Sequence, residues 1–181
     1  MPRINIFENF PKLHIQINAS SLSNGTLRIH QIYIPGSISF NNIAMIFSAS
    51  GTTAKTFTLS FGLYSLSGST LSLANSASVS SNPGANALSW ITLATSATQD
   101  ITPGNWFFGL IFSSSSNSLI GILCPPSPGG GAFQSAYSGP FQWGQYNTST
   151  SVLPASIATS DLSKANAGGD IQAHPYIVIS A

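Results

Sequence analysis

The side chains that could carry acid–base chemistry are few in this sequence, and they lie far apart. The carboxylates are Glu8, Asp100, Asp161 and Asp170, and no two of them are sequence neighbours. Glycoside hydrolysis, for example, needs two carboxyl groups that flank the same sugar, and the spacing indicates no such pair. We therefore interpret these carboxylates as turn and cap residues.

The histidines and the single cysteine give no metal-binding pattern. His14, His30 and His174 have neither the i,i+4 spacing of a helical zinc motif nor the short spacing of a zinc finger. A symmetric trimer that brings three copies of one histidine to its axis is the remaining route to a metal site. Cys124 has no second cysteine to pair with, so we interpret it as a small buried hydrophobic residue.

Nucleophilic catalysis has no signature in this chain either. Serine is abundant, but a serine nucleophile needs a positioned base beside it. The sequence contains no Gly-x-Ser-x-Gly, the motif that presents such a serine in one large hydrolase class. The sequence therefore predicts a protein that is not an enzyme and uses no metal or cofactor.

An aromatic-rich segment is the one candidate ligand site. Residues 125–154 open with PPSPGGG, which a central strand does not tolerate, so we predict a long loop. Aromatic rings stack on sugars, and the amides of Gln142 and Gln145 can bond sugar hydroxyls. The candidate binding residues within 133–147 are Tyr137, Phe141, Trp143 and Tyr146. The alternative is that these rings close one end of the domain or fill a subunit interface.

The elements that would position these residues are strands, because apolar residues alternate with a period of two. In each of two stretches four large hydrophobic residues share a face: Phe57, Leu59, Phe61 and Leu63, and Trp106, Phe108, Leu110 and Phe112. Phe107 and Ile111 lie opposite the second set, so we expect that strand to be covered on both faces.

Turn signals separate the strands at short intervals, as at Pro35-Gly36, Ser67-Gly68-Ser69 and Pro103-Gly104. One short helical turn is expected near residues 160–165, with Ser160 as its cap. Many short strands with turns between them are typical of an antiparallel sandwich or barrel. We predict an all-β fold, an antiparallel jelly-roll-like β-sandwich, as one domain over residues 29–181.

The first 28 residues differ from the rest of the chain. They contain four of the nine charged residues together with many large hydrophobic side chains. We predict an extended N-terminal arm over residues 1–28 that docks on a neighbouring protein. Its candidate assembly residues are Ile4, Ile6, Phe7 and Phe10. The alternative is a first strand followed by a loose tip.

Charge is nearly absent from this sequence. Charged residues make up 5% of the chain, where soluble domains carry about 25%. Such a surface favours packing against copies of the same chain or other proteins. The net charge of +1 without a basic patch argues against nucleic-acid binding. No apolar run reaches the roughly 18 residues of a membrane span, and the N-terminus lacks the continuous apolar region of a signal peptide.

Two stretches carry a family resemblance. Residues 61–73 read FGLYSLSGSTLSL, and residues 100–110 read DITPGNWFFGL. They resemble a hairpin and a following strand in small jelly-roll domains of bacteriophage tail fibres and other virion structural proteins. Residues 33–46, 153–157 and 175–179 are similar to further parts of these domains, so the resemblance covers about residues 28–181.

The resemblance implies a trimeric virion component, either a fibre tip, a receptor-binding module or a capsid decoration protein. It implies no catalytic residues. The chain is short and has no fibre-like stalk, which favours a role in capsid decoration, as a head fibre, or as a tail adaptor or tail-fibre component. The expected location is the virion, and the expected partners are copies of the chain and other virion proteins. The alternative function is a carbohydrate- or receptor-binding module that uses residues 133–147 on a host surface glycan.

Overall fold

The structure, a computed structural model, describes residues 6–8, 16–21, 25–49, 57–81, 88–114, 120–124, 143–147, 152–162 and 177–181. Most of these residues lie in strands, and no α-helix occurs among them. The strands are β1 (Ile6–Glu8), β2 (Gln16–Ser21), β3 (Thr26–Ile34), β4 (Ile38–Ala49), β5 (Phe57–Ser67), β6 (Thr70–Ser81), β7 (Leu88–Ile101), β8 (Gly104–Ser114), β9 (Ile120–Cys124), β10 (Trp143–Asn147), β11 (Ser156–Ala158) and β12 (Ile177–Ser180). The predicted all-β class is confirmed.

Eight consecutive strands pair as nested antiparallel hairpins. β5 pairs with β6, β4 with β7, β3 with β8, and β2 with β9. The innermost hairpin turns at Gly68, whose φ of 59° lies in the left-handed region that glycine adopts without strain. The chain from β2 to β9 therefore follows the course of one long hairpin that curls over on itself.

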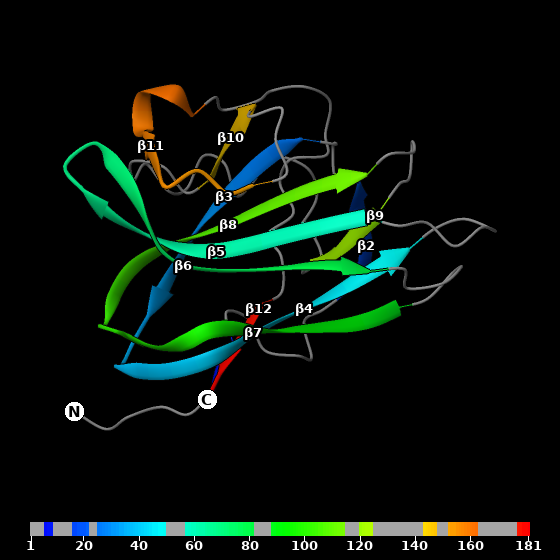
Figure 1. Ribbon diagram of the computed structural model, residues 1–181, viewed down its shortest axis with the longest axis horizontal. Helices are drawn as coiled ribbons and strands as arrows, with labels where there is room; N and C mark the ends of the chain where they lie inside the picture. The colour runs from blue at the N-terminus through cyan, green and yellow to red at the C-terminus, as the bar shows by residue number, and fades with distance from the viewer. Residues whose placement is uncertain are drawn as a thin grey trace.

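The curled hairpin forms two sheets that pack against each other (Figure 1). In the first sheet, β4 pairs with β7 along one side and with β12 and β9, end to end, along the other. β1 lies outside β12, and β2 lies outside β9. The second sheet has the order β10-β3-β8-β5-β6-β11. All the pairings are antiparallel, so the predicted antiparallel β-sandwich is confirmed.

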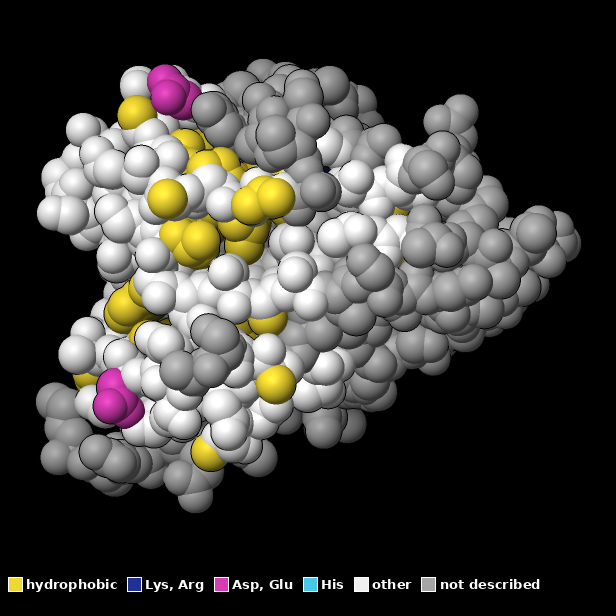
Figure 2. All heavy atoms as spheres, in the orientation of Figure 1, with side chains coloured by type: hydrophobic (Ala, Val, Ile, Leu, Met, Phe, Trp, Pro, Cys, Tyr) yellow, Lys and Arg dark blue, Asp and Glu magenta, His cyan; other side chains and the backbone are white. Residues whose placement is uncertain are grey.

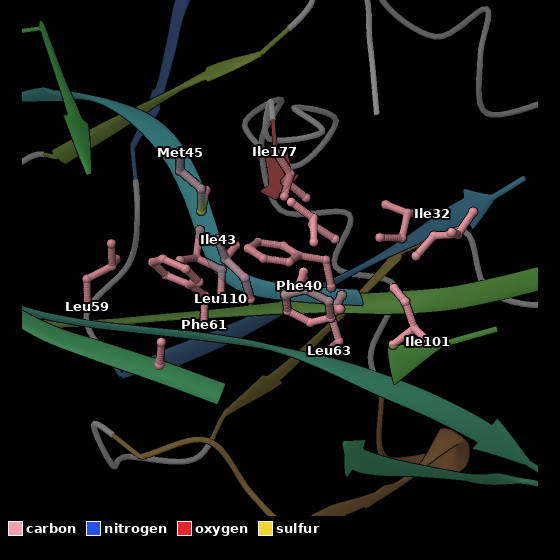
Figure 3. Close-up of a cluster of buried hydrophobic side chains, with 14 of the residues drawn as sticks. Ile32, Phe40, Ile43, Met45, Leu59, Phe61, Leu63, Ile101, Leu110 and Ile177 are labelled. Carbon is pink, nitrogen blue, oxygen red and sulfur yellow. The ribbon is translucent and has the colours of Figure 1, made fainter. Parts of the chain in front are cut away.

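The main core lies between the two sheets, and the alternating residues of the sequence supply it. Phe57, Leu59, Phe61 and Leu63 of β5 are all buried in this cluster, as the period of two predicts. Side chains of β4 and β12 from one sheet point toward those of β5 and β8 from the other (Figure 3). Aromatic pairs tie β5 to β8, with ring centroids 5.8 Å apart for Phe57 and Phe112 and 5.9 Å apart for Phe61 and Phe108.

A second apolar cluster lies on the outer face of the second sheet. Phe107 and Ile111 of β8, opposite the inward-facing residues, belong to it with Tyr64, so β8 is covered on both faces as expected. The cover is the segment of residues 152–162, which contributes Leu153, Ile157 and Leu162. The remaining members of the cluster are Leu27, Ile29 and Leu71, with Leu73 packed against it.

Backbone and side-chain hydrogen bonds fix residues 152–162 to the sheet. β11 pairs with β6 from Thr70 to Ser72. The Leu73 N–H donates to the Ala155 carbonyl at 2.9 Å, and the Tyr64 hydroxyl donates to the Pro154 carbonyl at 3.0 Å. Burial raises the pKa of this hydroxyl above its ordinary value of 10.0, because the phenolate would lose its hydration.

The expected helical turn differs in type and position. The structure has a 3-10 turn, η2, at Thr159–Asp161, and Ala158 precedes it where Ser160 was expected to be the cap. The Thr159 N–H donates to the Ser69 carbonyl at 2.8 Å. This bond to the tip of the β5–β6 hairpin fixes where the turn begins and takes the place of a side-chain cap.

Candidate interaction surfaces

The aromatic candidates fall partly in a strand. Trp143 and Tyr146 belong to β10, where the prediction was a continuous loop, so this part of the prediction is wrong. Aromatic residues favour strands, and β3 offers a free edge beside them. Backbone pairing sets Trp143 opposite His30 and Tyr146 opposite Leu27. Tyr137 and Phe141 lie outside the described residues.

The arm candidates fall partly in the first sheet. Ile6 and Phe7 lie in β1, opposite Ser180 and Ile179 of β12. β2 and the first residues of β3 also lie before residue 28, so the described parts of this segment pair with strands of the sandwich. This pairing is what the alternative of a first strand expects. Ile4 and Phe10 lie outside the described residues, and docking on a partner stays a prediction.

Two basic residues of β3 are buried beside β10, which the sequence did not indicate. Arg28 is 4% exposed and His30 is 3% exposed. Their cross-strand partners are Leu110 and Phe108 on β8, and Gln145 and Trp143 on β10. A buried guanidinium is stable only where hydrogen-bond acceptors compensate its lost hydration.

The inward direction of Arg28 and His30 follows from the register. Ile32 and Ile34, further along β3 at the same period of two, belong to the cluster between the sheets. Leu110 and Phe108 belong to that cluster too. The basic pair therefore supplies hydrogen-bond donors inside the sandwich, and its neighbours on β8 supply neither an acid nor a nucleophile. The sequence did hold one signal: Arg28 and His30 occupy the same alternating positions of β3 as Ile32 and Ile34.

The described surface is largely neutral. In the described part of the face in Figure 2, uncharged polar side chains and backbone predominate, hydrophobic side chains lie among them, and acidic side chains appear at two separate places. Among the described residues the exposed large hydrophobic side chains are Tyr33, Leu66 and Val152, at 64%, 40% and 69% exposure. Such isolated residues are normal on a protein surface. The surface offers neutral polar contacts with a few apolar side chains.

The carboxylates of Asp100 and Asp161 each accept a hydrogen bond from a serine hydroxyl. The Asp100 carboxylate accepts a hydrogen bond from the Ser39 hydroxyl across β4 and β7, and that of Asp161 accepts one from Ser160 at 3.3 Å. No group of three potential metal ligands occurs among the described residues. Within the same part of the chain no helix is long and apolar enough to cross a membrane.

Neither the protein-family models nor the curated proteins contain a match to this chain. Function is therefore inferred from the strand order, the buried residues and the composition of the surface.

Proposed function

We propose that this chain is a structural component of a bacteriophage virion: a capsid decoration protein, a head fibre, or a tail adaptor or tail-fibre component. The observation that carries the proposal is the nested pairing of β2–β9, β3–β8, β4–β7 and β5–β6. Every connection from β2 to β9, except the β5–β6 hairpin, joins one sheet to the other. Nested pairing with crossings between two sheets is what a jelly roll has, and viral capsid domains use jelly rolls, so the pairing supports the proposal together with the resemblance of residues 61–73 and 100–110.

The neutral surface supports the assembly part of the proposal. The chain has four acidic and five basic residues in 181. An interface made from such a surface desolvates few charges, and charged residues are depleted from the centres of protein interfaces. The proposed assembly is a trimer that forms through apolar and neutral polar surfaces. The N-terminal residues Ile4, Ile6, Phe7 and Phe10 are the proposed contacts with other virion proteins.

Light scattering on the purified full chain tests the assembly. Deletion of residues 1–28 would remove β1, β2 and part of β3, so the test of the arm replaces Ile4 and Phe10 with serine. The proposal expects a trimer of 18.8 kDa chains in both proteins, with the variant losing only attachment to the virion. Val152→Ser, at an exposed apolar position of the sandwich, is the matched control.

Immunogold labelling of particles from cells that make the chain tests its location. Label on the particles, reduced for the Ile4 and Phe10 variant, supports the proposal. A monomer at high concentration, with unlabelled particles, contradicts it.

The second candidate function is a carbohydrate- or receptor-binding module. The observation in its favour is β10, which sets Trp143, Gln145 and Tyr146 along an edge of the second sheet. An aromatic ring beside an amide is a common way to hold a sugar. A glycan array would test it, with Trp143→Ala expected to lose the signal and Val152→Ala expected to keep it. An array without a reproducible hit contradicts this function.

A further inference from the structure

One side of the sandwich is bordered by two strands that do not pair with each other. β6 ends the second sheet except where β11 adds at Thr70–Ser72, and β7 pairs only with β4 among the described strands. β6 and β7 are consecutive in the chain and in contact, lying beside each other in Figure 1. No described ladder joins them, so each has backbone donors and acceptors along an edge.

The side chains of these two strands give little protection against pairing with other proteins. Natural sheet edges commonly carry lysine, other charges or proline. β6 contains neither a charged residue nor a proline, and β7 contains Asp100 alone of these types. Apart from Asp100, the described exposed side chains are small and neutral, namely Thr70, Ser72, Ala74, Ser76 and Ser78 on β6 and Thr92, Ala94 and Thr98 on β7. Long neutral strands without proline readily join other strands.

Each of the two strands is interrupted by a bulge. In β6, Leu73 pairs with Tyr64 and Asn75 pairs with Leu63, so Ala74 is an extra residue. In β7, residues 95–98 lie between Ala94, opposite Asn42, and Gln99, opposite Phe40. One residue of β4, Asn41, therefore faces four residues of β7.

Local contacts hold both bulges in place. The Thr95 hydroxyl donates to the Asn41 carbonyl at 3.3 Å, which ties the β7 bulge to β4. The β6 bulge brings the Asn75 carbonyl over Gly62, where a Cβ atom would overlap the oxygen. Bulges bend a strand, increase its twist and end regular pairing.

We propose that these two bulges prevent this side of the sandwich from pairing strand to strand with other copies of the chain. The bulges block edge pairing as charged side chains do at the edges of ordinary sheets, in a chain that has few charged residues. Assembly is then limited to other surfaces, whichever they are. The inference is independent of the proposed virion role, because it concerns how an uncharged sandwich stays free of open-ended polymers.

Deletion of Ala74 is the direct test. It removes an exposed residue and makes Leu73, which packs on the outer cluster, directly precede Asn75, which is paired with the inward-facing Leu63. In the deletion variant, the side chains before and after the deleted residue therefore stay on the same faces of β6 as in the wild type. We expect the deletion variant to start with the native circular dichroism spectrum and then form β-rich polymers that bind thioflavin T, at a rate that rises with protein concentration. Ala74→Ser, which keeps the bulge, should behave as wild type.

A lysine on the same edge separates strand pairing from simple misfolding. Ser76→Lys places a charge at an exposed edge position, and in the deletion background it should abolish the polymers. Persistence of the polymers with Ser76→Lys, or a deletion variant that keeps the wild-type mass, overturns the proposal.

The wild-type background gives a measurement that does not depend on the deletion variant folding. Ser76→Lys in the otherwise unchanged chain should leave the mass measured by light scattering unaltered, because the bulged edge is not used for assembly. A fall in mass would show that copies associate through this edge and would overturn the proposal.

Discussion

Tyr64 links the sheet to the segment that covers it. Its hydroxyl is buried and donates to the Pro154 carbonyl. Tyr64→Phe removes this bond and leaves the carbonyl without that donor, so we expect a loss of about 1 kcal/mol in the free energy of unfolding at pH 7. Chemical denaturation measures this loss. Tyr33→Phe, at an exposed position, should change stability by less than about 0.5 kcal/mol.

The buried Tyr64 hydroxyl should also make the stability of the wild-type protein depend on pH. Burial raises the pKa of Tyr64 in the folded state above its ordinary value of 10.0. Above pH 10 the unfolded chain releases a proton that the folded chain keeps. Stability therefore falls as the pH rises, by up to about 1.4 kcal/mol per pH unit for this group. Tyr64→Phe lacks this decline, so its deficit against wild type should shrink between pH 10 and pH 11. A deficit that is constant over this interval contradicts the assignment.

Gly62 and Gly109 face each other across β5 and β8 and make room for larger neighbours. A Cβ on Gly109 would lie 2.6 Å from Cε2 of Tyr64, and a Cβ on Gly62 would overlap the Asn75 carbonyl. A ring can shift more easily than a backbone that is held in a bulge. We expect Gly62→Ala to cost about 3 kcal/mol, the upper end for overpacking, and Gly109→Ala to cost less. Thermal unfolding would show the order, with Ser76→Ala as the exposed control. Equal costs would contradict the role of the bulge.

At the scale of elements, the 152–162 segment acts as a cover for an apolar sheet face. Leu153 is 6% exposed, and its neighbour Val152 is 69% exposed. Leu153→Ala opens a space against Gly62 and the outer cluster, so we expect it to destabilise the protein by about 2–5 kcal/mol. Val152→Ala should change stability by less than about 0.5 kcal/mol. Urea unfolding of the pair measures both. Similar small effects would mean that the segment does not stabilise the sheet.

Elements that alternate strictly were predictable from the sequence. The inward face of β5 and the two covered faces of β8 follow from the period of two alone. β10 was missed because it follows a proline- and glycine-rich stretch, and its partner β3 is more than a hundred residues earlier. The burial of Arg28 and His30 was also missed, since burial depends on which strands lie alongside and not on residue type.

The bulges show a second limit of sequence patterns. Leu71 and Leu73, two residues apart on β6, both pack on the outer cluster. Before Ala74 the odd-numbered residues of β6 face the outer cluster. After Ala74 the odd-numbered residues face inward instead, and Ala77 is buried in the core between the sheets. No residue type in this part of the sequence indicates the change of register. The candidate site was predictable to a smaller extent, because Trp143 and Tyr146 were expected in a loop and the structure has them in the strand β10.

At the scale of the whole molecule, the two outer faces of the sandwich differ in what covers them. The chain covers part of the second sheet with its own residues 152–162. Among the described outward residues of the first sheet, Asn42, Thr92, Ala94 and Ser180 are small and uncharged, whereas Asp100 is acidic. In the proposed virion role, the chain has to remain soluble before it assembles and then pack closely. Neutral hydroxyl and amide groups meet both needs, provided that the strand edges are kept from pairing.

The scarcity of charge predicts how the proposed oligomer responds to salt. Raising NaCl from 0.1 M to 1 M shortens the screening length from about 10 Å to about 3 Å, which weakens interfaces that depend on exposed ion pairs. An interface of apolar and neutral polar groups has few such pairs to lose, so its dissociation constant should change by less than about threefold. Sodium sulfate should tighten it, because excluded salts strengthen apolar burial. Sedimentation velocity across a dilution series in each salt measures both effects. Dissociation at 1 M NaCl would show that the few charges of this chain are concentrated in the contact, and the neutral-surface model of assembly would have to be abandoned.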